Sequence, residues 1–195
     1  SVDLAAGTVS GAAGNDTLIN FSQIRGSGYN DTLFGSDSTL TERFEGLAGN
    51  DSIDGRGGFD NVAYDRSTSA VNVNLVTGTA SDGFGYTDTL SHIEGIRGSA
   101  YNDVLTGGLA ANGTSVSDGL SERFIGNAGN DTIDGGQGYD RVDYTTSPNG
   151  VNVTLNDTLD GSASDGFGGT DTLRHIEGVS GSAYNDTLTG SDSAP

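Results

Sequence analysis

The chain has no cysteine, no methionine and no tryptophan, and only 2 of its 195 residues are proline. Because cysteine is absent, disulfide bonds, thiolate metal sites and thiol redox chemistry are excluded. Small secreted domains commonly rely on disulfides, so a secreted protein of this composition needs another source of cohesion. Hydrophobic residues make up 32% of the chain, which is a thin supply for a conventional globular core.

Basic residues are also scarce. There are 8 Lys and Arg against 27 Asp and Glu, which gives a formal net charge of -19. Nucleic acids and anionic membranes favour basic surfaces, so we expect no nucleic-acid binding and no membrane insertion. Cations are the natural partners of such a chain. The sequence shows no signal peptide, long apolar run or initiating Met, and we expect it to be a segment of a longer protein.

Glycine, in contrast, is abundant, with 33 residues, and it recurs in a tandem nine-residue pattern. Residues 46–64 read GLAGNDSID and GRGGFDNVAY, and residues 126–144 read GNAGNDTID and GGQGYDRVDY. Each half has Gly at positions one and four, Asp at position six and a branched apolar residue at position eight. Two tandem copies at one spacing indicate a repeat architecture.

Longer strings confirm the repetition. The sequence IRGSGYNDTL at 24–33 returns in related form at 96–105 and 179–188. Short apolar segments separated by glycine turns, with no helical period, predict an all-β fold. We expect one continuous solenoid over residues 1–195, built from repeat blocks 1–68, 69–148 and 149–195, the last of them truncated.

Ten turns share one further rule: an aspartate is followed two residues later by a branched aliphatic residue. In a strand both side chains lie on the same side, so stacked coils would place the carboxylates of one column about 5 Å apart. A cation between them would relieve their repulsion. The candidate metal-binding aspartates are Asp16, Asp31, Asp51, Asp60, Asp88, Asp103, Asp131, Asp140, Asp171 and Asp186.

Carboxylates and peptide carbonyls, with no His or Cys in the pattern, are the hard oxygen ligands that suit Ca²⁺. Glycine at positions one and four is expected to supply the positive φ that aims carbonyls at the ion. Positions one and three of the full nonapeptides complete the candidate ligand set: Gly46, Ala48, Gly55, Gly57, Gly126, Ala128, Gly135 and Gln137.

The strings GLAGNDSIDGRGGFD and GNAGNDTIDGGQGYD resemble the repeats-in-toxin (RTX) nonapeptide. The resemblance implies a right-handed parallel β-roll with several Ca²⁺ ions between stacked turns. It also implies type I secretion from a bacterium, folding triggered by Ca²⁺ outside the cell, and a parent such as an adhesin. The pattern is looser where Tyr29, Tyr101 and Tyr184 replace the fourth Gly, and whether those turns bind metal stays open.

We expect two columns of carboxylates. One edge would stack Asp16, Asp31 and Asp51, then Asp88, Asp103 and Asp131, then Asp171 with Asp186. The opposite edge would carry Asp60 and Asp140, each completed from its variable loop by Asp37 or Glu42, and by Asp118 or Glu122.

No nucleophile motif, zinc motif or phosphate loop is present, so we expect no enzyme. His92, His175, Glu94 and Glu177 recur at matching positions and are expected to be structural. The alternative function is an adhesin domain that binds a glycan or a cell surface, with Ca²⁺ only rigidifying it. An ordered, pocket-forming loop at 107–122 would favour that alternative. End-to-end self-association of the solenoid also stays open.

Overall fold

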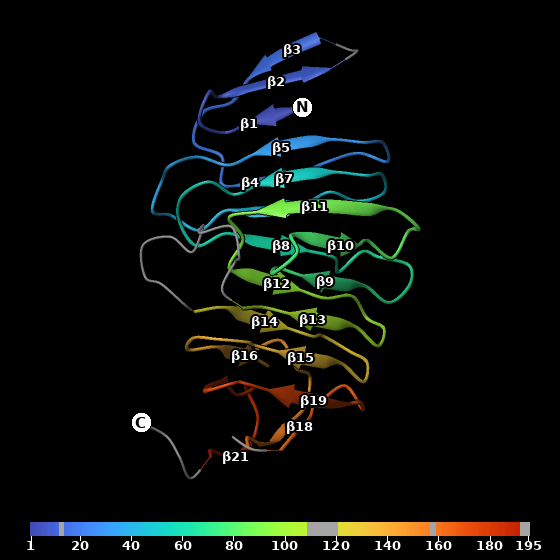
Figure 1. Cartoon of the computed structure of the whole chain (residues 1–195), viewed down its shortest axis with the longest axis vertical. Coiled ribbons are helices and arrows are strands. Elements are labelled where there is room, and N and C mark those ends of the chain that lie inside the picture. The colour runs from blue at the N-terminus through green and yellow to red at the C-terminus, as the bar shows by residue number, and fades with distance from the viewer. Residues whose placement is uncertain (12–13, 109–120, 157–158, 192–195) are drawn as a thin grey trace.

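The computed structural model describes residues 1–11, 14–108, 121–156 and 159–191. Within these ranges there is no helix, and the strands form one 14-stranded and one 7-stranded sheet. Figure 1 shows the strands stacked one above another along the long axis of the molecule. No helix in the described part of the chain is long and apolar enough to span a membrane.

Each sheet takes its strands from the whole length of the chain. The 14-stranded sheet holds β1 (Val2–Asp3), β2 (Thr8–Gly11), β3 (Gly14–Thr17), β5 (Thr32–Phe34), β7 (Ser52–Asp54), β9 (Asn72–Asn74), β10 (Thr79–Ser81), β11 (Thr87–Ser91), β13 (Val104–Thr106), β15 (Thr132–Asp134), β17 (Asn152–Thr154), β18 (Gly161–Ser164), β19 (Thr170–Arg174) and β21 (Thr187–Thr189). The 7-stranded sheet holds β4 (Gln23–Arg25), β6 (Arg43–Glu45), β8 (Asn61–Ala63), β12 (Gly95–Arg97), β14 (Arg123–Ile125), β16 (Arg141–Asp143) and β20 (Gly178–Ser180).

The chain winds from one sheet to the other and back. Strand β5 is followed by β6 in the other sheet, and β7 then pairs in parallel with β5, with Ile53 beside Leu33. Strand β8 pairs in parallel with β6, with Val62 beside Phe44. The predicted all-β solenoid of stacked parallel strands is therefore confirmed.

Three antiparallel excursions interrupt the winding, and the sequence analysis did not foresee them. Strand β10 runs antiparallel to both β9 and β11, and β18 does the same between β17 and β19. At the reversal between β9 and β10, Gly78 takes a φ of 64° and Asn74 Oδ1 accepts the Thr77 N–H. Strand β2 lies likewise between β1 and β3. These hairpins enlarge one sheet only, which explains why the two sheets differ in size.

The core is a narrow stack between the sheets. The middle residue of each short strand points inward, because side chains alternate along a strand. Phe44 and Phe124 are fully buried in the 7-stranded sheet, and Leu33 and Leu105 are fully buried opposite them. Burying one such side chain contributes about 1.5–3 kcal/mol. Because each short strand provides only about one inward side chain, the stability that this core gives is limited.

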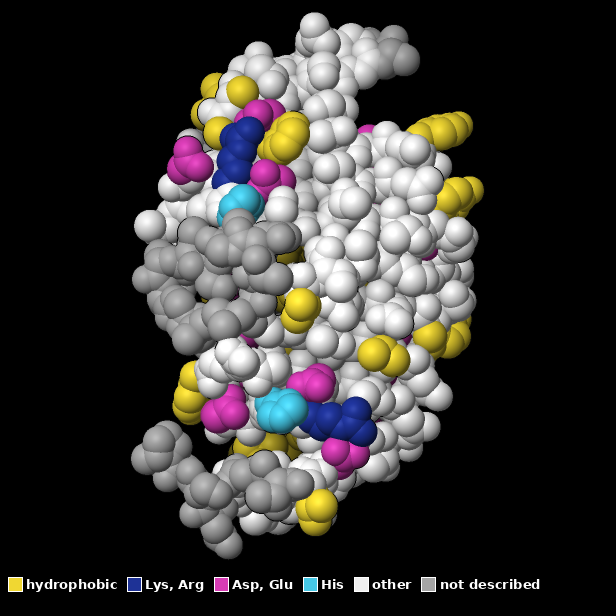
Figure 2. Space-filling model, viewed as in Figure 1, with side chains coloured by type: hydrophobic (Ala, Val, Ile, Leu, Met, Phe, Trp, Pro, Cys, Tyr) yellow, Lys and Arg dark blue, Asp and Glu magenta, His cyan; other side chains and the backbone are white. Residues whose placement is uncertain are grey.

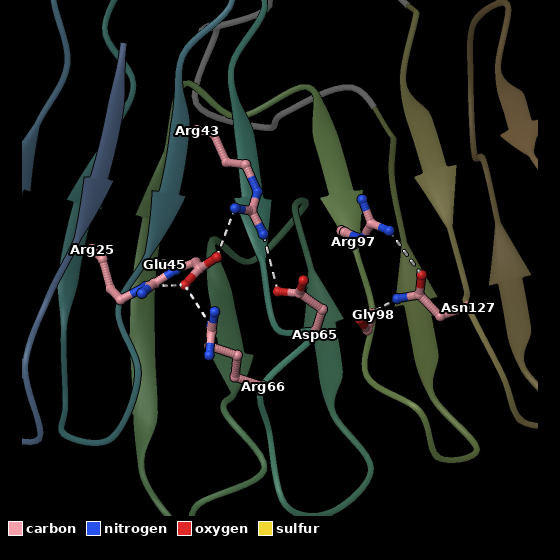
Figure 3. Close-up of polar contacts among 8 residues, drawn as sticks. All are labelled: Arg25, Arg43, Glu45, Asp65, Arg66, Arg97, Gly98 and Asn127. Carbon is pink, nitrogen blue, oxygen red and sulfur yellow. Dashed lines mark hydrogen bonds and ion pairs between the residues drawn. The ribbon is translucent and has the colours of Figure 1, made fainter. Parts of the chain in front are cut away.

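Arginines on the outer face of the 7-stranded sheet surround one buried acid (Figure 3). The Glu45 carboxylate is bound by Arg25 and Arg43, both at 2.6 Å, and by Arg66 at 3.4 Å. Burial opposes ionisation of Glu45, but the Arg25 hydrogen bond and the nearby positive charges outweigh it and lower its pKa. Arg43 also pairs with Asp65 and so ties β6 to the segment after β8.

Much of the negative charge lies inside the molecule. On the face drawn in Figure 2, acidic side chains form only small, separate groups. The buried acids are Glu42, Glu45, Asp51, Asp60, Asp82, Asp88, Glu94, Asp103, Glu122, Asp131, Asp140, Asp143, Asp165 and Asp171. Charged groups are rarely buried without a partner. Glu45 and Asp143 are paired with arginines, and the remaining acids locate the candidate site.

Candidate metal centre

A first column of carboxylates lies where the chain enters strands of the 14-stranded sheet. In this column the backbone N–H of one coil donates to the carboxylate of a neighbouring coil. The pairs are Asp31 to Asp51 (2.7 Å), Asp51 to Asp88 (3.0 Å), Asp103 to Asp131 (2.8 Å) and Asp131 to Asp171 (3.0 Å). The structure thus brings six of the predicted aspartates into two groups of three: Asp31, Asp51 and Asp88, and Asp103, Asp131 and Asp171.

The hairpins divide this column, which corrects the predicted continuous stack. Strands β9 and β10 lie between β11 and β13, so Asp88 does not stack on Asp103. The Val71 N–H takes that place and donates to Asp103 Oδ1 (2.8 Å). Strands β17 and β18 separate Asp171 from Asp186 in the same way, and Asp186 accepts the Val151 N–H instead (2.9 Å).

Asp16 stands apart from the column. It lies on β3, which is exposed and, within the described ranges, pairs only with β2; two strands separate β3 from β5. The predicted stacking of Asp16 on Asp31 is therefore wrong. The physical reason is the first hairpin, which carries Asp16 to the outer edge of the sheet.

A second column lies where the chain enters the 7-stranded sheet, and it contains glutamates. Glu42 donates its N–H to Asp60 (3.0 Å), Asp60 to Glu94 (2.8 Å), Glu122 to Asp140 (2.8 Å) and Asp140 to Glu177 (2.8 Å). Of the two partners proposed for each loop, Glu42 and Glu122 are the ones beside Asp60 and Asp140. Asp118 lies outside the described residues, as does most of the 107–122 loop.

Sequence reasoning assigned Glu94 and Glu177 a structural role and left them out of the columns. A detectable signal was present, because each is followed two residues later by an apolar residue, Ile96 or Val179. The aspartate rule would have found both glutamates if Glu had been admitted at that position.

The structure gives the first glycine of the nonapeptide a role different from the one expected. The left-handed φ values fall at positions two and four: 73° at Leu47 and 127° at Gly49, and 70° at Asn127. A Cβ placed on Gly46 would instead overlap the Asp51 carboxylate, and the same holds for Gly126 and its aspartate. Position one is thus glycine because the sixth-residue carboxylate folds back over it.

Asn127 fixes the position of its turn relative to the neighbouring coil. Its side-chain amide donates to the Gly98 carbonyl (2.7 Å), and its oxygen accepts from Arg97 (3.3 Å), as Figure 3 shows. The turn that precedes Asp131 is therefore held against strand β12 by the chain's own hydrogen bonds.

Some turns satisfy their own carboxylate through a serine at position two; we call these serine-capped turns. Ser99 donates to Asp103 through both its N–H and its hydroxyl, each at 2.6 Å. Ser36 contacts Glu42 in the same two ways, at 2.9 and 2.6 Å. Equivalent contacts join Ser27 to Asp31 and Ser182 to Asp186. The looser Tyr-containing turns all belong to this class.

The turns of the full nonapeptides lack such a donor. In each of them one buried carboxylate oxygen has no hydrogen-bond partner among the residues that the structure describes: Asp51 Oδ2, Asp60 Oδ2, Asp131 Oδ2 and Asp140 Oδ2. Glu122 Oε2 is also unpartnered. A buried oxygen without a donor costs about 1–3 kcal/mol, and more when it is charged.

Burial therefore raises the pKa of these carboxyl groups. It raises that of Asp51 to about 6, that of Asp60 to about 7 and that of Asp131 to about 8. Glu122 and Asp140 lie against each other, so two acceptors meet without a donor unless one of them is protonated. Burial and this contact raise the pKa of Glu122 to about 9.

Backbone carbonyls lie close to the carboxylates of both kinds of turn. A Cβ built on Gly55 would overlap the His92 carbonyl oxygen and lie 2.8 Å from Asp60 Oδ2, and Gly135 has the same neighbours in His175 and Asp140. The serine-capped turns show the same proximity. A Cβ built on Gly26 would lie 2.5 Å from the Gly46 carbonyl oxygen and 2.8 Å from Asp31 Oδ2, so these two atoms face a common space. The Gly126 carbonyl and the Asp103 carboxylate meet in the same way above Gly98. The carbonyls of Gly55 and Gly135 are likewise in contact range of Gly35 and Gly107 on the preceding coil.

These donors fit a hard cation such as Ca²⁺. In the described part of the chain no three His, Cys, Asp or Glu side chains form a ready-made metal cage. A site must therefore combine one or two carboxylates with peptide carbonyls, a mixture that Ca²⁺ accepts and Mg²⁺ accommodates less readily. Ala48, Gly57 and Ala128 are half-buried and Gln137 is exposed, and their role as ligands stays a prediction.

The histidines have identifiable structural partners. His92 Nδ1 lies 2.6 Å from Asp54 Oδ1, and His175 Nδ1 lies 2.7 Å from Asp134 Oδ1. Both histidines have a left-handed φ, 52° and 48° respectively, so each marks a tight turn between the sheets. These contacts agree with the expected structural role.

Comparison with known proteins identifies the class. The stacked coils and oxygen-lined turns define a calcium-binding β-solenoid, and the chain matches the RTX calcium-binding nonapeptide repeat over residues 23–39, 40–65, 96–112, 118–144 and 179–194. These segments span more than half of the chain, which belongs to this family. RTX repeats form a structural calcium-binding module that is generally non-catalytic. No curated protein matches the chain.

Proposed function

We propose that this calcium-binding module belongs to a larger exported bacterial protein, such as an adhesin, and folds when Ca²⁺ fills its turns after secretion. The observation that carries the proposal is the set of buried carboxylate oxygens without partners in the nonapeptide turns. Such oxygens oppose folding while they are bare and favour it once a cation binds them. Folding and metal binding are then a single process.

The proposed ions sit at the full nonapeptide turns. Asp51 and Asp131 would supply carboxylates in the first column, and Asp60 and Asp140 in the second. The carbonyls of position one would supply further ligands. The serine-capped turns need no ion, because their carboxylates already accept two hydrogen bonds within the turn.

The energetic scale supports coupled folding. An ion present at 100 times its dissociation constant stabilises the folded state by about 2.7 kcal/mol. A narrow core provides little stability without metal, and repulsion within a net charge of -19 opposes folding. The stabilisation from several bound ions can outweigh this deficit. Low free Ca²⁺ inside a bacterium and higher free Ca²⁺ outside would keep the chain unfolded during export and fold it at the cell surface or beyond.

Far-UV circular dichroism of the chain during a Ca²⁺ titration tests this proposal. We expect a cooperative coil-to-strand transition that Mg²⁺ does not reproduce and that a chelator reverses. A strand signal that persists in chelator at pH 8, where the buried carboxyl groups are least protonated, would contradict Ca²⁺-driven folding and favour a metal-independent adhesive solenoid.

A further inference from the structure

Two buried aspartates outside the nonapeptides resemble the site residues in every respect except their motif. Asp82 and Asp165 are fully buried in the turns between β10 and β11 and between β18 and β19, residues 82–86 and 165–169, which we call the hairpin turns. Both lie outside the segments that match the RTX family, and sequence reasoning missed them. The repeated string DGFG was the available signal.

Each of these aspartates uses only one carboxylate oxygen. Asp165 Oδ1 accepts the N–H groups of Phe167, Gly168 and Gly169 at 2.8–2.9 Å. Asp82 Oδ1 accepts two N–H groups of its own turn, at 2.8 and 2.9 Å. In both residues Oδ2 is buried and has no partner in the described part of the chain.

The hairpin turn lies against a nonapeptide turn of the preceding coil. The Thr170 N–H donates to Asn130 Oδ1 (2.8 Å), next to Asp131. A Cβ built on Gly169 would overlap the Gly129 carbonyl oxygen and lie 2.8 Å from Asp165 Oδ2. A nonapeptide carbonyl and the free hairpin carboxylate oxygen therefore face one space.

The nonapeptide aspartate supplies the second free oxygen. Asp131 Oδ2 is buried and has no partner among the described residues, and Asp131 directly follows Gly129 and Asn130, the two residues that contact the hairpin turn of Asp165. The first copy repeats this arrangement with Asp51 and Asp82, where the Thr87 N–H donates to Asn50. Tyr86 takes the place of Gly169 there, so the carbonyl contact above Gly169 belongs to the second copy.

A third buried acid lies beside each pair of nonapeptide and hairpin aspartates: Asp171 in the second copy and Asp88 in the first. A tyrosine hydroxyl already donates to this acid. The Tyr144 hydroxyl donates to Asp171 Oδ2 (2.8 Å), and Asp171 Oδ1 accepts the Asp131 N–H. Tyr64 and Asp88 repeat this contact at 3.1 Å. Only the nonapeptide and hairpin aspartates therefore retain a free oxygen in each group.

We propose that each hairpin turn closes a Ca²⁺ site with the nonapeptide turn of the preceding coil: Asp165 with Asp131, and Asp82 with Asp51. This inference rests on the calcium binding of the nonapeptide turns proposed above. Two carboxylates, carbonyls such as that of Gly129, and water supply the six to eight oxygens that Ca²⁺ takes. In the first hairpin, between β2 and β3, Gly11 stands where the later hairpins have Asp82 and Asp165. That hairpin therefore has no corresponding carboxylate, and its Asp16 is exposed.

The test is the number of Ca²⁺ ions bound by the full chain, measured by isothermal titration calorimetry. Asp165→Asn keeps the Oδ1 acceptor of the hairpin turn and removes the free carboxylate oxygen, so we expect one ion fewer. Asp82→Asn should also lose one ion, and the double variant two. Asp160→Asn is the matched control, since that acid is exposed, paired with Arg174 and outside the site; it should keep the full number.

The outcomes separate the two proposals. If the unmodified chain binds no Ca²⁺, the proposed function fails. If it binds Ca²⁺ and the two hairpin variants keep every ion, only the hairpin sites are refuted. If both hairpin variants fail to fold at saturating Ca²⁺ while Asp160→Asn folds, the inference is also refuted, because losing one ion among several should leave the fold intact.

Discussion

Asp140 offers the sharpest perturbation of a nonapeptide turn. Its Oδ1 accepts the Glu122 N–H (2.8 Å), and its Oδ2 is buried without a partner beside the unpartnered Glu122 Oε2. Asp140→Asn preserves the first contact and removes the charge that a cation would balance. We expect the variant to fold but to bind at least one ion fewer.

The loss has a defined size. At Ca²⁺ 100 times the dissociation constant, each missing ion lowers the free energy of unfolding by about 2.7 kcal/mol. More tellingly, each bound ion adds about 1.4 kcal/mol to that free energy for every tenfold rise in free Ca²⁺. Urea denaturation at several free Ca²⁺ concentrations measures this dependence, and its slope should fall by that amount in Asp140→Asn.

Asp186→Asn is the control for this experiment, because the Asp186 carboxylate accepts hydrogen bonds from Ser182 and Val151 and lies in a serine-capped turn. Its slope against Ca²⁺ should equal that of the unmodified chain. An unchanged slope in Asp140→Asn would refute the assignment of an ion to this turn. Equal losses in both variants would refute the distinction between the two kinds of turn.

Three further predictions follow from the same contacts. Ser99→Ala removes the hydroxyl donor to Asp103 and should cost about 1–3 kcal/mol in urea denaturation, with the number of bound ions unchanged. Gly126→Ala places a Cβ over the Asp131 carboxylate and should raise the Ca²⁺ midpoint of folding in circular dichroism, whereas Gly28→Ala, which meets no atom, should not; equal midpoints would contradict the steric role of position one. Because the folded-state pKa of Asp131, about 8, is above that of an unfolded carboxyl, the Ca²⁺-free folded form is favoured by protonation at low pH and loses that stability as pH rises through 8. Circular dichroism in chelator should therefore show more strand at pH 5 than at pH 8. Less strand at pH 5 would contradict the role of protonation in the Ca²⁺-free form.

Much of the fold could be predicted because its determinants are local. The alternation around Phe44, Ile53 and Val62 sets which side chains face inward, and the repeated glycines set where the chain turns. Two consecutive nine-residue units are enough to specify one coil. The same periodicity places Asp51 and Asp60 at opposite edges, as the sequence indicated.

The parts that sequence reasoning missed depend on contacts distant in the sequence. Nothing local distinguishes β10, which pairs antiparallel on both sides, from another coil strand. The hairpins that contain β10 and β18 divide the first column, and the hairpin of β2 and β3 carries Asp16 out of it. Likewise, the burial of Asp82 becomes evident only when its turn packs on the preceding coil.

The role of the serine-capped turns also needed three dimensions. Ser99 looks like one more residue at the variable second position of the nonapeptide, yet its hydroxyl and N–H saturate Asp103. Asp131 has the same sequence position in its own turn and retains a free oxygen because Asn127 is directed to the neighbouring coil instead. One side chain at position two therefore separates a turn that closes itself from one that needs a cation.

Anomalous scattering from crystals of the chain grown with Ca²⁺ would locate the ions themselves. We expect anomalous peaks beside the free oxygens of Asp51, Asp60, Asp131 and Asp140, and none beside the serine-capped Asp103. Peaks at Asp103 with none at the nonapeptide turns, or an ordered chain with no peaks at all, would contradict this expectation.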